Sequence, residues 1–280
     1  MSRTINIAKD VGFCAGVRKA VDTAKQAASA SGEVLMLGNI VHNETVVLEL
    51  EQLSVHVVGS LDEVAPDKPV LFRAHGTPRE VAEIARQRNL KIIDATCPLV
   101  LEIHRTVKEM EAEKRRIIII GDHGHEEVEA IASQVAEAIV ISGPQEACAF
   151  SKCRRAGVVA QSTQAFGNVS EVIRILLEKV DDLRFVNTIC HPTRHRQAQI
   201  QELADSNDVM IIVGSFSSAN TGRLTEIASR INPRTYQISG PAELKASWFS
   251  DAQSVGIAAG ASTPQEIVAE TAKKINQFPG

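Results

Sequence analysis

Short aliphatic runs alternate with segments of helical periodicity along the whole sequence. The alternation begins with RTINIA and AGVRKAVDTAKQAAS and continues to the C-terminal segments SVGIAAG and TPQEIVAETAKKI. Strand-length apolar runs separated by helix-length segments are typical of parallel sheets with helices on both faces. The sequence therefore predicts an α/β fold whose sheets are mostly parallel.

Three of the five cysteines occupy the same place in this pattern, where a predicted strand ends and a predicted helix begins. They are Cys14 in GFCAGV, Cys97 in DATCPLV and Cys190 in NTICHPT. Because they recur at intervals of 83 and 93 residues, they divide the chain into three similar α/β units. We expect these units to span residues 15–97, 98–189 and 190–280, with the N-terminal segment 1–14 joined to the third.

The same three cysteines predict a shared metal site. Ligands of open α/β sheets bind beyond the carboxyl ends of the strands, and a helix N-terminus favours the thiolate form that binds metals. Taken singly, each thiol has an alternative interpretation as a small buried apolar residue. Cys148 and Cys153 are expected in a connection and outside the metal site, because a zinc clip built on their spacing would need a second ligand pair that the sequence lacks.

Histidine, hydroxyl and amide residues also stand between predicted strands and the helices that follow them. They are His42, His75, His125, Ser215, Ser217, Ser218, Asn220 and Ser262. Each one alone is explained as an ordinary loop or helix-cap residue. Together with helix N-termini, such neutral donors suit a phosphate or diphosphate group. Neither a Walker A motif nor GxGxxG is present, so the sequence does not support a nucleotide.

The composition of the chain argues against nucleic acid and membranes as partners. A formal net charge of −4 at pH 7 and only eight Phe, one Trp and one Tyr argue against nucleic acid. Aliphatic runs such as Ile117–Ile120 are far shorter than the roughly 18 residues of a membrane-spanning helix. The N-terminus has no apolar leader segment, so we expect a cytoplasmic protein without a membrane partner.

Eight short motifs give the chain a resemblance to one enzyme family. They are GFCAGV, VHN, AHG, DATCPLV, GHEEVE, IC-x-PT-x-x-RQ, S-x-NT-x-RL and AGAS, and they run from residue 12 to about residue 262. The chain resembles the 4-hydroxy-3-methylbut-2-enyl diphosphate reductases, the iron–sulfur reductases of the non-mevalonate isoprenoid pathway. The resemblance implies a trefoil of three α/β units around a central cluster, with the strand near Thr4–Ala8 pairing in the third unit.

The resemblance also implies a cofactor and roles for the site residues. One four-iron four-sulfur cluster per chain would be held by Cys14, Cys97 and Cys190, which leaves one iron open to the substrate hydroxyl. Thr163 would lie near that hydroxyl, and Glu127 would deliver a proton. The diphosphate would be bound by His42, His75, His125, Ser218, Asn220 and Ser262.

The implied reaction is the reductive dehydroxylation of 4-hydroxy-3-methylbut-2-enyl diphosphate to isopentenyl and dimethylallyl diphosphate. A ferredoxin or flavodoxin would supply the electrons, and a monomer is expected because no heptad pattern offers a dimer seam. Two alternatives stay open. One is an iron–sulfur paralogue that acts on another small molecule, and the other is a non-catalytic metal-binding or redox-sensing protein.

The sequence departs from the family pattern beside the proposed acid. The usual His-Pro-Glu is replaced by His125-Glu126-Glu127, and Ala219 stands where some relatives have serine. The additional carboxylate of Glu126 is expected either to raise the pKa of Glu127 or to point to solvent.

Overall fold

The architecture consists of three parallel sheets covered by helices. The computed structural model describes residues 3–278, and over that range it contains three four-stranded sheets in which every pair of neighbouring strands is parallel. The predicted α/β class with parallel sheets is therefore confirmed. None of the helices within residues 3–278 combines the length and the apolar character needed to cross a membrane.

The chain forms two compact units. The terminal unit comprises the described residues of Met1–Ala15, His42–Glu44 and His191–Gly280, and the central unit comprises Gly16–Val41 and Thr45–Cys190. The central unit contains two of the sheets and the terminal unit contains the third. The two sheets of the central unit lie inside the predicted ranges 15–97 and 98–189, and the third sheet combines strands of residues 190–280 with the N-terminal strand, while the division of the chain at residues 97 and 189 stays a prediction.

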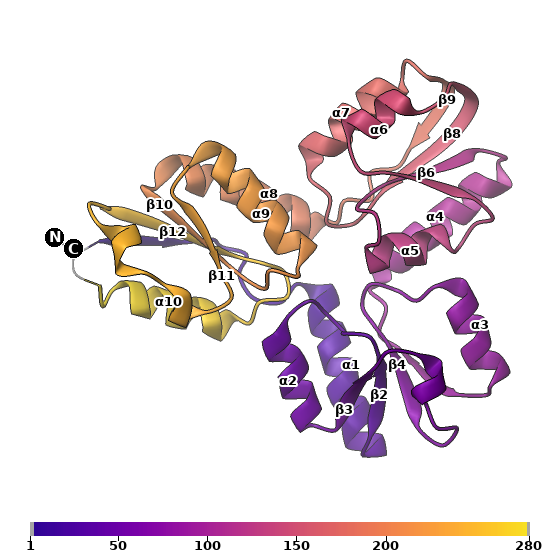
Figure 1. The fold of residues 1–280 in the computed structure, drawn as a ribbon, viewed down its shortest axis with the longest axis horizontal. Helices are drawn as coiled ribbons and strands as arrows, with labels where there is room; N and C mark the ends of the chain where they lie inside the picture. The colour runs from indigo at the N-terminus through magenta and orange to yellow at the C-terminus, as the bar shows by residue number, and fades with distance from the viewer. Residues whose placement is uncertain (1–2, 279–280) are drawn as a thin grey trace. The chain divides into compact units, whose positions relative to one another are not determined.

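The first sheet of the central unit has the strand order β3-β2-β4-β5. Its strands are β2 (Val34–Leu37), β3 (Val55–Val58), β4 (Pro69–Phe72) and β5 (Lys91–Asp94). Helices α1 (Ala15–Ser31) and α2 (Glu44–Gln52) lie on one side of it and α3 (Arg79–Gln87) lies on the other (Figure 1). Leu35 and Leu37 pack in a cluster with Ala85 of α3, whereas the alternating Val34 and Met36 are buried on the opposite face.

The second sheet of the central unit has the order β7-β6-β8-β9. Its strands are β6 (Arg116–Ile120), β7 (Ala138–Ile141), β8 (Cys153–Ala160) and β9 (Val180–Phe185), and its helices are α4 (Pro98–Ala112), α5 (Glu126–Ala132), α6 (Pro144–Ala149) and α7 (Phe166–Leu176). Ile117 and Ile119 pack with residues of α4 and α5, while Ile118 and Ile120 pack with residues of α6 and α7. This strand is apolar throughout because helices cover both of its faces.

The sheet of the terminal unit has the order β1-β12-β10-β11. Its strands are β1 (Thr4–Ile7), β10 (Val209–Val213), β11 (Thr235–Ile238) and β12 (Ser254–Ala259). Helices α8 (His191–Ser206) and α9 (Ala219–Ile231) cover one face, and α10 (Gln265–Ile275) covers the other (Figure 1).

All three sheets share one topology. In each, a first strand pairs with the second strand on one side and with the third on the other, and a fourth strand pairs with the third. The fourth strand is β5 or β9 in the central unit, but in the terminal unit it is β1, whose register runs from Thr4 opposite Ser254 to Ile7 opposite Ile257. The predicted pairing of the N-terminal strand with the C-terminal sheet is thereby confirmed. Because the strand order reverses between the first and third strands, their carboxyl ends mark the expected ligand site of each sheet.

Two local predictions are corrected by the structure. Cys153 was expected in a connection but is the first residue of β8, at the edge of the sheet opposite the carboxyl ends. The strand that was expected to end directly before Cys190 lies earlier in the sequence, since β9 begins at Val180 and ends at Phe185. β9 is an outer strand and carries Asp182, which pairs with Arg155 at 2.9 Å. Charged residues are accepted on outer strands, so apolar runs alone placed this strand too late.

A buried histidine makes the stability of the fold depend on pH. His104 on α4 lies against Gly76, and burial lowers its pKa to about 4, with Lys108 adding to the effect and Asp94 opposing it. Between pH 6.5 and 4 the unfolded chain binds a proton that the folded chain refuses, so stability is lost as the pH falls through this window. We expect the free energy of unfolding to fall by about 2 kcal/mol between pH 7.5 and 5.

Urea unfolding at several pH values measures this loss, and His104→Gln is the matched variant because glutamine does not titrate. The pH dependence between 7.5 and 5 should be shallower in His104→Gln by the contribution of this one residue. Identical slopes in the two proteins would contradict the assignment to His104.

Candidate active site

The three cysteines predicted as metal ligands share one backbone contact. The N–H of Cys97 donates to Ala74 O, that of Cys190 to Ser162 O and that of Cys14 to Ala261 O, each at 3.0 Å. In every sheet the acceptor is the second residue after the third strand, and the cysteine immediately precedes a helix. Cys97 and Cys190 lie in the central unit, Cys14 lies in the terminal unit, and all three are half-buried. The cysteines therefore occupy equivalent positions in the three sheets.

The predicted polar residues of the site also recur at equivalent positions. The fifth residues after the first strands are His42, His125 and Ser218, the seventh are Glu44, Glu127 and Asn220, and the third residues after the third strands are His75, Thr163 and Ser262. Eight of these nine residues were predicted as catalytic or substrate-binding residues, and they lie at the carboxyl ends of neighbouring strands, whereas Ser215 and Ser217 lie outside these positions. The ninth residue, Glu44, was not predicted, although an alignment of the three repeats against one another would have indicated it.

Glu127 is a buried carboxyl group in the central unit. It is 2% exposed, its Oε1 accepts a hydrogen bond from Ser162 N–H at 2.6 Å, and its Oε2 accepts one from the Ser162 hydroxyl at 2.7 Å. Burial raises the pKa of Glu127 because it disfavours the charged form, while the two bonds from Ser162 and the nearby His75 act in the opposite direction. A carboxyl group that keeps its proton to higher pH than an ordinary carboxyl group is suited to act as an acid.

Ser162 is a site residue that the sequence analysis missed. The motif AQSTQ directed attention to Thr163, whose hydroxyl accepts a hydrogen bond from the Gln161 amide at 3.0 Å. The hydroxyl in contact with Glu127 belongs to Ser162, whose carbonyl also accepts the N–H of Cys190. The role of Thr163 stays a prediction, and Ser162 connects Glu127 to the loop that carries Cys190.

His125 caps helix α5 with its ring. Its Nδ1 accepts the N–H of Glu127 at 3.1 Å. In the neutral ring the proton is then on Nε2, which is a hydrogen-bond donor. The ring of His75 meets that of His125 edge-on, with 5.9 Å between the centroids. Two of the predicted diphosphate ligands are thus neighbours.

Glu126 does not simply point to solvent, as one expectation had it. It forms a salt bridge with the Arg73 guanidinium, and its Oε2 lies 3.3 Å from His75 Nδ1. Burial is the largest cause of the raised pKa of Glu127. The carboxylate that replaces the usual proline is therefore engaged by two side chains of the loop after β4.

The terminal unit contributes donors around its own strand ends. The Ser218 hydroxyl accepts the N–H of Thr221 at 3.3 Å, and the Ser262 hydroxyl donates to His42 O at 3.1 Å. Asn220 is 5% exposed, and within residues 3–278 neither atom of its side-chain amide has a hydrogen-bond partner. Buried amides are nearly always hydrogen-bonded, so this one is available to a bound ligand or water.

Two further polar residues organise the terminal unit. Glu44 accepts hydrogen bonds from the hydroxyls of Ser215 at 2.7 Å and Ser217 at 3.1 Å, and the Ser215 bond is the largest cause of its lowered pKa. Arg196 is 6% exposed and donates to the carbonyls of Gly12, Ala259 and Gly260. Arg196 thereby ties the loop that leads to Cys14 to the loop that leads to Ser262. This arginine belongs to the motif IC-x-PT-x-x-RQ, but its role was not predicted from the sequence.

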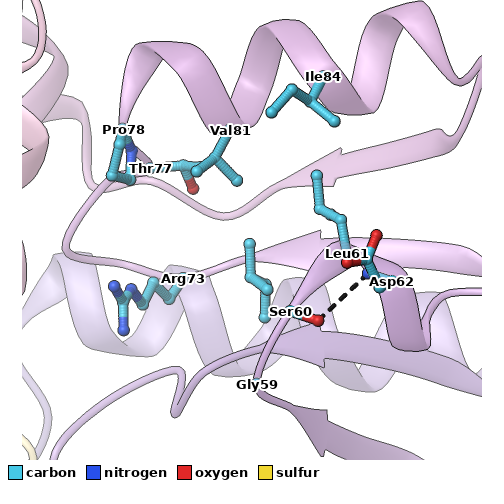
Figure 2. Close-up of a pocket in the computed structure, with 10 residues that line it drawn as sticks. Gly59, Ser60, Leu61, Asp62, Arg73, Thr77, Pro78, Val81 and Ile84 are labelled. Atoms are coloured by element: carbon cyan, nitrogen blue, oxygen red, sulfur yellow. Dashed lines mark hydrogen bonds between the residues drawn. The ribbon is translucent and has the colours of Figure 1, made fainter.

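A cavity of about 340 Å³ lies near the carboxyl ends of β2, β3 and β4 in the central unit. Figure 2 shows Arg73 at one end of it and Val81 and Ile84 of α3 on its wall. Asp62 pairs with Arg88 at 3.0 Å, and Arg73 pairs with Glu126. The charged groups on the lining of the cavity are therefore paired with other residues. The surface that the cavity presents to a ligand is mainly apolar.

Fold and site together define an α/β protein with three equivalent parallel sheets, each carrying a cysteine and polar donors at its strand ends. The chain belongs to the LytB protein family, whose model matches residues 5–276. The family is one of oxidoreductases, since similar proteins are named as reductases.

Relatives and solved structures resemble the chain over nearly its whole length. The 4-hydroxy-3-methylbut-2-enyl diphosphate reductase of Geobacter sulfurreducens is 39% identical over 98% of this chain and 97% of the relative, and that of Trichlorobacter lovleyi is 39% identical over 97% of each. A solved (E)-4-hydroxy-3-methyl-but-2-enyl diphosphate reductase, described as the terminal enzyme of the non-mevalonate pathway, is 36% identical over 98% of this chain and 99% of its own, with a TM-score of 0.70. The Plasmodium falciparum reductase structure has a TM-score of 0.95 at 23% identity, covering 100% of this chain and 90% of its own, and supports the fold.

Proposed function

We propose that this chain catalyses the reductive dehydroxylation of 4-hydroxy-3-methylbut-2-enyl diphosphate to isopentenyl and dimethylallyl diphosphate. The reaction takes up two electrons and two protons and releases the hydroxyl group as water. The observation that carries the proposal is that every cysteine and polar residue assigned by the motifs stands at one of a few positions that repeat in all three sheets. The names of the near full-length relatives supply the substrate.

The cofactor of the proposed reaction is one four-iron four-sulfur cluster. Cys14, Cys97 and Cys190 would hold it, and their identical amide contacts fit a shared ligand set of thiolates. When bound, such a cluster supplies electrons and, through an iron without a protein ligand, Lewis acidity. A ferredoxin or flavodoxin is the proposed electron donor.

The proposed diphosphate ligands are neutral or cationic donors. In the central unit they are His75 and His125, and the Nε2–H of neutral His125 is a donor because its Nδ1 accepts a backbone N–H. In the terminal unit they are His42, Ser218, Asn220 and Ser262, and the buried amide of Asn220 without a partner supports a ligand there. Neutral donors and helix N-termini can bind an anion in a chain whose net charge is negative.

The proposed proton donor is Glu127. Burial keeps it protonated to higher pH than an ordinary carboxyl group, and Ser162 holds both of its oxygens. A proton delivered to the departing hydroxyl converts hydroxide into water, a better leaving group. Thr163, the next residue, is proposed to lie near the substrate hydroxyl.

Iron and acid-labile sulfide analysis of anaerobically purified protein, followed by turnover with a reduced dye, tests this function. We expect about four iron and four sulfide per chain, dye oxidation that depends on the substrate, and both products. Bound iron without turnover would overturn the proposed reaction, and zinc in place of iron with no sulfide would overturn the cluster as well.

A further inference from the structure

Glu126 connects two loops that carry proposed ligands of the diphosphate. It is the first residue of α5, directly after His125 and directly before Glu127. Its carboxylate reaches Arg73 and His75, which both follow strand β4 of the neighbouring sheet. One side chain therefore joins the loop after β4 to the start of α5, within the central unit.

The geometry places a guanidinium and an imidazole ring beside one partly buried carboxylate. Arg73 Nη1 donates to Glu126 Oε1, and Glu126 Oε2 lies 3.3 Å from His75 Nδ1. The side chains of Arg73 and His75 are each 17% exposed and that of Glu126 is 28% exposed. Solvent and salt screen such contacts less than they screen contacts on an open surface.

The backbone at Gly38 leaves room for the end of the Arg73 side chain. Gly38 has a φ of +70°, and a Cβ at this position would stand 2.6 Å from Arg73 Nη1. A side chain at this position would adopt a strained backbone conformation and would displace the end of the Arg73 side chain from its present place. Glycine at position 38 is therefore compatible with the Arg73–Glu126 pair as it stands.

The Arg73–Glu126 pair also explains how a carboxylate can lie beside the proposed diphosphate site. Glu126 alone would repel a diphosphate, but the charge of Arg73 offsets it. His75 is faced by Glu126, by the ring of His125 at 5.9 Å and by the carboxyl group of Glu127. The carboxylate lies on the Nδ1 side of the ring, which leaves Nε2 as the nitrogen for another partner.

We infer that Glu126, held by Arg73, is a positioning residue for His75: its carboxylate on the Nδ1 side favours the ring form that carries a proton on both nitrogens, so that Nε2–H is the donor presented to a diphosphate oxygen. The inference rests on the proposed function, in which His75 is a diphosphate ligand. In this role Glu126 itself contacts neither the substrate nor the proton that is transferred in the reaction.

Glu126→Gln removes the charge and keeps the size of the side chain. We expect KM for the diphosphate substrate to rise about tenfold, the effect of losing one well-placed ligand, while kcat stays within about twofold. Glu126→Pro should behave alike, because proline is well accepted at the first helical position and the start of α5 would survive. The matched control is Glu129→Gln, an exposed carboxylate of the same helix, which should change neither constant.

A measurement without substrate separates this inference from the proposed function. Nitrogen-15 NMR of the histidine rings, with His75→Gln for assignment, should show a protonated Nδ1 on His75 in the parent protein and a changed signal in Glu126→Gln but not in Glu129→Gln. An unchanged His75 signal, or a fall in kcat at constant KM, would overturn the positioning role. A changed signal with unchanged KM would remove His75 from the proposed diphosphate site, whereas a parent protein that never turns over the substrate would overturn the proposed function.

Discussion

Glu127→Gln is expected to lower kcat by about 10² to 10⁴ while KM changes little. The buried carboxyl is the proposed proton donor, and glutamine cannot titrate. The amide can still satisfy both contacts of Ser162, because its oxygen can accept the backbone N–H and its NH₂ can donate to the hydroxyl oxygen. The loss should therefore be one of chemistry and not of folding. Turnover with reduced dye, at equal iron content and over a range of substrate concentrations, measures it.

The pH dependence of the same variant provides the control. In the parent protein, kcat should fall as the pH rises through the raised pKa of Glu127, since the acid loses its proton there. That limb should be missing from the residual activity of Glu127→Gln. Near-normal turnover in Glu127→Gln, or a larger loss of kcat in Glu126→Gln, would show that the neighbouring carboxylate is the acid.

Arg196→Met is expected to destabilise the protein by about 3 to 5 kcal/mol, which corresponds to a fall in Tm of about 10 °C. The guanidinium is buried and donates to Gly12 O at 2.7 Å, to Ala259 O at 2.8 Å and to Gly260 O at 3.1 Å. Methionine fills much of the volume but removes the guanidinium donor from all three carbonyls, of which Gly260 O still accepts the N–H of Thr263 at 3.2 Å. The loss of a charged donor to buried acceptors is costly. Thermal unfolding of the purified protein measures the change.

Arg194 offers a matched control on the same helix. It is exposed, so Arg194→Met should leave Tm within about 2 °C of the parent. In Arg196→Met the loop before Cys14 loses its tie to the loop before Ser262, and the iron content after purification should fall as well. Equal Tm values for the two variants would contradict a structural role for Arg196.

Local patterns were sufficient for the fold class and for most of the candidate site. Alternating strand and helix periods predicted parallel sheets, because helices on both faces require continuous apolar strands such as Ile117–Ile120. The order of predicted strands and helices also placed Cys97 and His125 at strand ends before helices, where backbone N–H groups of the helix are available. Those positions depend on short stretches of sequence, so they could be predicted without a structure.

Other features depend on residues far apart in the chain. Periodicity shows which faces of an element are apolar, but hydrogen-bond and charge partners are chosen by proximity in space. The tertiary structure therefore decided that Ser162 rather than Thr163 contacts Glu127, and that the partly exposed Glu126 pairs with Arg73. It also decided the role of Arg196, because a lone arginine in a helical pattern does not reveal that three distant carbonyls converge on it.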